Sequence, residues 1–197
     1  SPYYHLLYNK RDDKEAQEFL DNLISFLKPS KEEIFLDLAC GKGRHSRYLN
    51  SKGFEVTGVD LSQESIEFAK QFENESLSFF VHDMRRVFRV NYFHYVLNLF
   101  TSFGYFENEK EDILALKAIH QSLKPGGFLV LDFMNSSKVA RNLIPEESKT
   151  INGIIFQVKR YVKSGFIIKE INVGDKGNKH QFFERVQALT KHDFEKY

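Results

Sequence analysis

Acidic residues and glycines recur at particular places in the first half of the sequence. Asp37 stands four residues before Gly41, Gly43 follows closely, and Asp60 ends the next apolar run. Glycines have no side chain, so a ligand can approach their backbone closely. They also adopt backbone dihedral angles that other residues avoid. An ionised carboxylate only accepts hydrogen bonds, and its two oxygens suit the two neighbouring hydroxyls of a ribose. A glycine turn followed by such an acid therefore indicates a site for a nucleoside-containing ligand.

Two classes of ligand fit a turn of this kind. Dinucleotide-binding proteins carry the pattern Gly-x-Gly-x-x-Gly, but here Ser46 stands at the third glycine position, where a small residue is needed for helix packing. Asp37 would repel a pyrophosphate, whereas it would attract the cationic amino group of S-adenosylmethionine (SAM). The residues favour SAM as cofactor, and an NAD-dependent oxidoreductase is the alternative.

Residues at the tips of later apolar runs complete the expected cofactor site. Asp83 follows the run 77–81 and is expected to accept a hydrogen bond from the adenine amino group. Leu61 and Met84 are expected to enclose the adenine ring between them. Asn98 lies near the end of a further apolar run, where the transferred methyl group is expected to point.

The elements that must position these residues alternate between apolar strands and amphipathic helices. Strands are predicted at residues 34–40, at the run that ends at Asp60, and at 77–81, 93–100 and 128–133; helices are predicted at 13–27, after Gly43, after the N-cap Ser62, and from the cap Asn108 to Ser122. This order predicts an α/β fold with a doubly wound, mostly parallel Rossmann-like sheet. Ligands of such sheets bind at the carboxyl ends of the strands, where the acids and glycines fall.

The pattern changes from about Glu147 onward. Three β-rich runs are separated by turns, at residues 154–162, 166–173 and 182–189. They predict an antiparallel meander without helices, appended after the fifth strand. We therefore expect a SAM-binding domain at residues 1–145 and a β appendage at 146–197, which serves as a wall of the substrate site or as a dimer surface.

Aromatic and basic residues near the N-terminus are candidates for the methyl-acceptor side of the site. Tyr4, Tyr8 and Arg11 precede the first predicted helix, and Tyr105 follows the fourth predicted strand. We expect these residues to border the acceptor or to form a lid over it. The alternative is that this segment only packs against the sheet.

Composition excludes several classes of protein. The chain has 197 residues, a formal net charge of +1 and one cysteine, Cys40, which is expected to be a small buried packing residue. The balanced charge argues against a nucleic-acid partner, and no apolar run is long enough to span a membrane. His82, His94 and His120 lack metal-ligand spacing, so no metal is expected. The sequence predicts a protein of the reducing cytoplasm.

These motifs together resemble those of the class I SAM-dependent methyltransferases. The matching stretches are 37–43, similar to the family's acid-x-Gly-x-Gly-x-Gly motif with Ala39 in place of the first glycine; 59–62, similar to the ribose-binding motif; 82–84, similar to the adenine motif; and 123–128, similar to the turn into the fifth strand. The resemblance implies methyl transfer from SAM. It also implies Gly41, Asp60 and Asp83 as SAM contacts and Asp37 near the methionine end.

The acceptor is less well defined by the sequence. DNA amino-methyltransferases of this fold carry Asn/Asp-Pro-Pro-aromatic after the fourth strand, whereas this chain has Asn-Leu-Phe-Thr at 98–101. A small-molecule acceptor is therefore expected, and no catalytic residue is assigned because methyl transfer mainly needs alignment of donor and acceptor. A SAM-binding domain without activity of its own is a further alternative. The family's last two strands have no counterpart, so we expect a shortened form, and a homodimer through the fifth-strand edge or the appendage.

Overall fold

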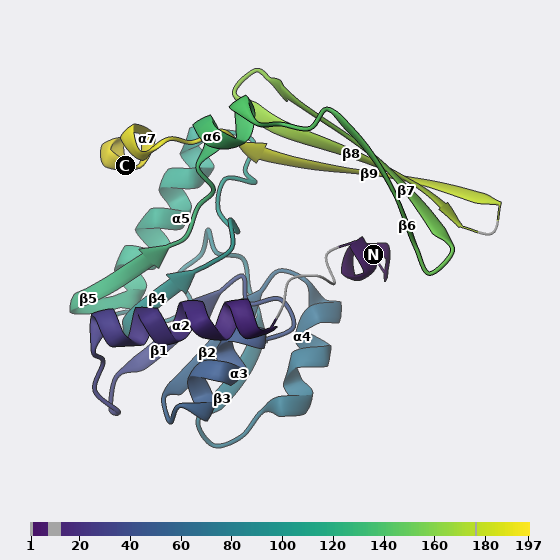
Figure 1. The fold of residues 1–197 in the computed structure, drawn as a ribbon. Coiled ribbons are helices and arrows are strands. Elements are labelled where there is room, and N and C mark those ends of the chain that lie inside the picture. Colours follow the sequence, from purple (N-terminus) through teal and green to yellow (C-terminus); the bar gives the residue numbers. More distant parts are fainter. Residues whose placement is uncertain (1, 8–12, 176) are drawn as a thin grey trace. The chain divides into compact units, whose positions relative to one another are not determined.

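The computed structural model describes residues 2–7, 13–175 and 177–197, which group into two compact units. The first unit holds residues 13–103 and 107–133 of the described chain, and the second holds 2–7, 104–106 and 134–197. Each unit has its own sheet (Figure 1). The predicted division at residue 145 was contiguous; here α1 and the segment from Met134 group with the antiparallel sheet, because their apolar side chains pack there.

The first unit is built on a five-stranded parallel sheet. Its strands are β1 (Ile34–Leu38), β2 (Glu55–Asp60), β3 (Leu77–Val81), β4 (Phe93–Asn98) and β5 (Leu123–Leu131). They lie in the order β3-β2-β1-β4-β5, and all four neighbouring pairs are parallel. The strand order reverses between β1 and β4, so the tips of β1 and β4 flank the switch point where such sheets bind ligands. The predicted doubly wound sheet is confirmed.

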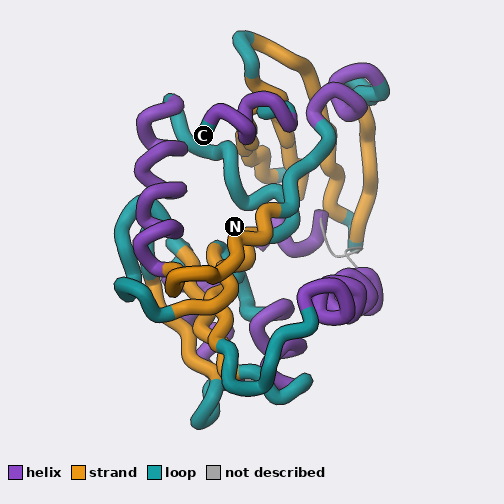
Figure 2. Tube along the Cα trace, turned by 90° about the vertical axis from the view of Figure 1, so that its left-hand side faces the viewer, coloured by secondary structure: helices purple, strands orange, loops and turns teal. Residues whose placement is uncertain are grey.

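Helices cover both faces of this sheet, as Figures 1 and 2 show. They are α2 (Asp13–Leu27), α3 (Arg44–Ser51), α4 (Gln63–Ala69) with the 3-10 turn Lys70–Phe72, and α5 (Glu109–Ser122). One core cluster joins Leu20 of α2, Leu49 of α3 and Ile66 of α4 to Phe35 of β1, and it includes the buried Cys40. A second cluster joins α5 to the opposite side chains of β1, β2 and β4. Successive side chains along each strand point to opposite faces of the sheet, so the strands contribute residues to two separate cores.

Local signals begin and end these helices where the sequence indicates. The Ser62 hydroxyl accepts a hydrogen bond from Ser65 N at 3.2 Å, and the Asn108 side chain accepts from Lys110 N at 3.1 Å. These are N-caps, which satisfy backbone N–H groups that lack a partner within the helix. The helix α5 ends at Ser122, but β5 begins directly afterwards at Leu123, five residues earlier than predicted. The register shift between Phe93 and Tyr95 accommodates the extra residues at the glycine pair.

The second unit is built on a four-stranded antiparallel sheet with three short helices. The strands are β6 (Glu146–Ile151), β7 (Ile154–Lys163), β8 (Phe166–Asp175) and β9 (Asn178–Gln187), in that order; the helices are α1 (Pro2–Leu7), α6 (Ser136–Arg141) and α7 (Lys191–Lys196). The meander is confirmed, but β6 was missed because it is a mostly polar, half-exposed edge strand. No helix of the described chain interrupts the four strands; the short helices lie before and after them, where Asn135 caps α6 and Thr190 caps α7.

Among the helices of the described chain, none has both the length and the apolar character that a membrane crossing requires.

Candidate functional site

The turn after β1 has a backbone that side chains normally disfavour. Ala39, Gly41 and Gly43 all have positive φ, at 64°, 56° and 77°. A side chain at Gly43 would place Cβ 2.6 Å from the Phe79 ring, so only glycine lets α3 begin this close to β3. Nothing lies within 4 Å of the position that a Cβ on Gly41 would take, so this part of the turn faces open space.

The Asp60 carboxylate ties this turn to the tip of β2. Its Oδ2 accepts a hydrogen bond from Gly41 N at 2.8 Å, and its Oδ1 accepts from Ser62 N at 2.8 Å. Both oxygens keep further lone pairs, because each can accept more than one hydrogen bond. The predicted acid of the second strand is thus held in a fixed orientation beside the open glycine.

Asp37 is buried beneath the same turn. Its side chain is 1% exposed, and its Oδ2 accepts a hydrogen bond from Ser46 Oγ at 2.6 Å. Burial raises the pKa of Asp37 to about 6, opposed by the bond from Ser46, with a further rise from the negative charge of Asp60. An ionised Asp37 is therefore compensated only in part, by the hydrogen bonds from Ser46 and the positive charge of Arg44, and a cationic ligand group would add to this compensation.

Asn98 connects β4 to β1 at the switch point. It is fully buried, and its Nδ2 donates to the carbonyl oxygen of Leu38 at 3.0 Å. Its Oδ1 has no hydrogen-bond partner among the described residues. An unsatisfied buried acceptor costs about 1–3 kcal/mol, so this oxygen is suited to a donor from outside the chain.

The residues after Asn98 form a strained turn that Asp132 holds in place. Phe100 and Thr101 both have positive φ, at 56° and 55°. Asp132 Oδ2 accepts from Phe100 N at 2.9 Å, and the Asp132 carbonyl accepts from Thr101 N at 3.0 Å. The Phe100 ring stacks on His45 with a centroid distance of 4.9 Å, and burial lowers the pKa of His45 to about 4. The imidazole is therefore neutral at physiological pH, and it adds no positive charge to this turn.

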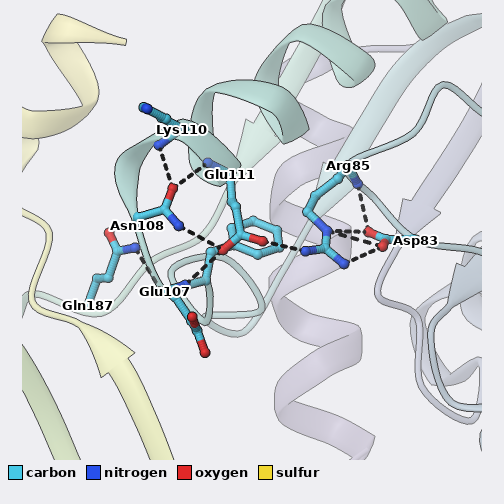
Figure 3. A network of polar contacts seen from close by, with 8 residues as sticks. Asp83, Arg85, Glu107, Asn108, Lys110, Glu111 and Gln187 are labelled. Atoms are coloured by element: carbon cyan, nitrogen blue, oxygen red, sulfur yellow. Dashed lines mark hydrogen bonds and ion pairs between the residues drawn. The ribbon is translucent and has the colours of Figure 1, made fainter.

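Asp83 belongs to a polar network that links the loop after β3 to α5 (Figure 3). Arg85 donates from Nε and Nη2 to the Asp83 carboxylate, and its Nη1 donates to Glu111 Oε1. The hydrogen bonds from Arg85 hold the pKa of Asp83 below its ordinary range. Glu111 also accepts from Glu107 N at 3.1 Å, so the network includes the start of α5. Asp83 is therefore already engaged by a bidentate arginine, and only its remaining lone pairs are open to a ligand.

The other predicted site residues differ in exposure and in the unit to which they belong. Leu61 is 71% exposed beside the Asp60 tip, whereas Met84 packs against the core cluster on the α5 side of the sheet. Tyr105 is 52% exposed and belongs to the second unit. Tyr8 and Arg11 lie outside the described residues, and Tyr4 is described only as part of α1.

The part of the chain that carries this site is similar to a known family. Residues 35–127 match the family model described as "Methyltransferase domain", the part that carries β1, the glycine turn and the strand tips. Over these residues, just under half of the chain, the sequence is that of a methyltransferase domain. SAM is the cofactor of this domain, and the preference for SAM over NAD that Asp37 and Ser46 indicated is confirmed.

Relatives of the methyltransferase domain cover the chain to different extents. The Bacillus subtilis protein YqeM is 40% identical over 115 residues, which are 57% of this chain and 46% of that protein. The dTDP-3-amino-3,4,6-trideoxy-alpha-D-glucopyranose N,N-dimethyltransferase of Streptomyces venezuelae is 24% identical over 196 residues, 95% of this chain and 81% of that enzyme. This chain therefore spans less than half of the first relative and most of the second.

A solved structure shares the fold of both units. The SAM-dependent methyltransferase of Clostridium acetobutylicum superposes with a TM-score of 0.81 at 21% identity, covering 99% of this chain and 82% of that one. At this identity the likeness concerns the fold. The antiparallel sheet is accordingly part of a recurring architecture that accompanies the methyltransferase domain.

Several residues of the site were missed in the sequence. Ser46 entered only as a departure from the dinucleotide pattern, yet it is the hydrogen-bond donor to Asp37. Asp132 and Phe100 meet only because β4 and β5 are neighbours, which no local pattern reveals. The detectable signal was Asp132 itself, an acid near the end of the predicted apolar strand at 128–133.

Proposed function

We propose that this protein transfers the methyl group of SAM to an amine nitrogen of a small molecule. The observation that carries the cofactor part is the Asp60 carboxylate, fixed by Gly41 N and Ser62 N beside a glycine that faces open space. This arrangement presents spare carboxylate lone pairs to a ribose diol next to an accessible backbone. The NAD-dependent alternative is not favoured.

The residues at the strand tips fit the whole of SAM. Asp60 would accept from the ribose hydroxyls, and the backbone of Ala39, Gly41 and Gly43 would line the methionine portion. Asp37 would face the α-ammonium group, whose charge favours the ionised form that burial disfavours. The unpaired Oδ1 of Asn98 is the other acceptor available for that end of the ligand.

The adenine end is assigned to the tips of β2 and β3. Leu61, exposed at the tip of β2, would cover one face of the adenine ring. Met84 would contact the opposite face from the side of the core. The adenine amino group would donate to the lone pairs that Arg85 leaves on Asp83. Arg85 then acts as a positioning residue, because it fixes the carboxylate that the ligand meets.

The chemistry requires little from acids and bases of the chain. When bound, SAM supplies a methyl group activated by its sulfonium leaving group. The protein residues must hold the acceptor nitrogen in line with that methyl group, an alignment that can contribute about 7–11 kcal/mol. His45 is buried and neutral near the strained turn, so it places no second cation in the surroundings of the sulfonium.

The acceptor assignment is supported by the relative that covers nearly the whole chain. The Streptomyces venezuelae enzyme, which extends over 95% of this chain, is an amino-sugar N,N-dimethyltransferase. Relatives that match shorter stretches act on more varied acceptors, including glycine and demethylmenaquinone. Because the acceptor must be recognised outside the shared cofactor unit, the relative that includes the second unit is the better guide.

Calorimetry and turnover test this proposal separately. SAM is expected to bind with release of heat and NADH to give no signal; binding of NADH without SAM would overturn the cofactor assignment. The 3-amino-3,4,6-trideoxyglucose nucleotide and its 3-hydroxy analogue are then compared by mass spectrometry for S-adenosylhomocysteine release. Turnover is expected with the amine alone, and turnover with the hydroxyl analogue alone would contradict an amine acceptor.

Asp37→Asn is expected to stabilise the free protein while weakening SAM binding. An acid whose folded pKa is raised binds more protons when folded, so wild-type stability falls as pH rises from about 4 to about 6. The variant lacks this penalty, which amounts to at most about 3 kcal/mol at pH 7.5 and vanishes below about pH 4. Urea unfolding of the wild type and of Asp37→Asn, at pH 7.5 and at about pH 4, measures the difference in their free energies of unfolding.

The same substitution alters the pH dependence of SAM affinity. In the wild type, SAM affinity is expected to fall as the pH drops below about 6, because the protonated Asp37 no longer attracts the ammonium group. Well below this pH the decrease approaches about tenfold per pH unit. Asp37→Asn is expected to bind more weakly at pH 7.5 and to lose this dependence. An unchanged profile in the variant would remove Asp37 from the ammonium site.

We also propose a cytoplasmic location and a homodimer. A reducing cytoplasm suits the single cysteine, Cys40, which is buried and has its pKa raised by burial. A homodimer through the β5 edge or the antiparallel sheet would cover exposed apolar groups such as Phe128, which is 55% exposed.

A further inference from the structure

The inner face of the antiparallel sheet is apolar over its middle section. Phe156 and Val158 of β7 and Ile171 and Val173 of β8 are buried. They point to the same side, because in each strand they alternate with less buried positions and the register pairs Phe156 with Val173 and Val158 with Ile171. Phe182 of β9 lies directly opposite Ile171 in the register and extends this face. The sheet therefore offers a continuous apolar floor.

Helix α1 covers part of this floor. Leu6 and Leu7 lie one helical turn after Tyr3, and all three pack against the buried cluster of the sheet. The Tyr3 hydroxyl donates to Asp175 Oδ2 at 3.1 Å, and its ring lies 6.1 Å from that of Phe182. One end of the helix is thus fixed near the β8–β9 turn.

A pocket remains between α1 and the sheet. It has a volume of about 220 Å³ and is lined by Tyr3, Leu7, Phe156, Ile171, Phe182, Phe183 and Glu184. An apolar cavity of about 150 Å³ already holds a benzene ring. This pocket therefore has room for one six-membered ring with small substituents, and its aromatic walls suit a flat or chair-shaped face.

Glu184 supplies the charged side chain of the pocket lining. Glu184 is paired across the strands with Lys169, at 3.6 Å, and both side chains are largely shielded from solvent. Glu184 lies on the same face as Phe182, two residues away, so its carboxylate ends the apolar floor on that side. A carboxylate only accepts hydrogen bonds, so a ligand that fills the pocket must present a donor at this end.

We propose that this pocket is a binding site for a single, largely apolar six-membered ring that carries a hydrogen-bond donor. The ring occupies the space between Leu7, Ile171 and Phe182, and its hydroxyl or amino substituent donates to Glu184. The site is made entirely of residues of the second unit. It therefore goes beyond the proposed function, which rests on the strand tips of the first unit.

Methyl-detected NMR of the whole chain tests this assignment with phenol, cyclohexanol and toluene as probes. Phenol and cyclohexanol are expected to shift the methyl signals of Leu7 and Ile171 in a saturable manner. Toluene, which matches phenol in size but has no donor, is expected to bind about tenfold more weakly. Absence of saturable shifts for all three probes would overturn the site, and equal binding of toluene and phenol would overturn the donor requirement.

Three variants separate the pocket from the rest of the sheet. Leu7→Trp fills the space and is expected to weaken phenol binding at least about tenfold, whereas Ile155→Trp, on the opposite exposed face of β7, is the matched control and leaves it unchanged. Glu184→Gln keeps the shape but removes the charge, and it is expected to weaken phenol and not toluene. Undiminished phenol binding in Leu7→Trp would place the probe elsewhere and contradict the proposal. SAM calorimetry on the same samples reports separately on the first unit.

Discussion

Gly43→Ala is expected to lower the free energy of unfolding by about 3 kcal/mol, which urea denaturation measures. Its Cβ would lie 2.6 Å from two atoms of the Phe79 ring, and Phe79 is fully buried and unable to move aside. Overpacking of this kind costs about 1–3 kcal/mol. The φ of 77° adds about 1–2 kcal/mol for any residue with a side chain.

Gly41→Ala is the matched control for this prediction. The φ of 56° is also left-handed, but no atom lies within 4 Å of the added Cβ. The free energy of unfolding is therefore expected to fall by only about 1–2 kcal/mol. SAM affinity is expected to fall because the new methyl group projects into the open space assigned to the cofactor. If both variants lose the same stability, the contact with Phe79 is not the reason for glycine at 43.

Asp60→Ala is expected to raise the dissociation constant of SAM about 100-fold. The substitution removes both the acceptor for the ribose hydroxyls and the acceptor for Gly41 N and Ser62 N. Hydrogen bonds to a charged group contribute about 1.5–3 kcal/mol each, so the loss of one or two to the ligand accounts for a change of this size. Isothermal calorimetry at neutral pH measures it.

Glu64→Ala provides the control for charge alone. Glu64 is exposed in the first turn of α4, next to the same strand tip, and it takes no part in the proposed contacts. Its removal is expected to change SAM affinity by less than about twofold, since exposed charges are screened by salt. A wild-type dissociation constant in Asp60→Ala would show that the ribose is held elsewhere.

Local sequence signals were sufficient for most of the first unit. The predicted helix at 13–27 and strand at 77–81 coincide with α2 and β3, and the caps Ser62 and Asn108 begin α4 and α5. Apolar periodicity and capping chemistry act over a few residues, so a single sequence displays them. The parallel arrangement followed from the alternation of strands and helices.

Contacts between distant segments could not be predicted in the same way. The strand β6 is mostly polar and is stabilised by pairing with β7, and the helix α1 depends on apolar partners in β8 and β9. The buried Asp37–Ser46 bond required the packing of α3 against β1. The acids and glycines of the site could be predicted from the sequence. The groups that hold them in position could not.

The turn at Phe100 and Thr101 ties the shape of the methyltransferase core to its edge strand. Two consecutive left-handed residues other than glycine are unfavourable by about 1–2 kcal/mol each, and a free chain would not keep them. They persist because Asp132, just beyond β5, binds both of their N–H groups. Any event that displaces the outermost strand, such as strand exchange with a second molecule, would therefore release this turn and disturb the switch point with it.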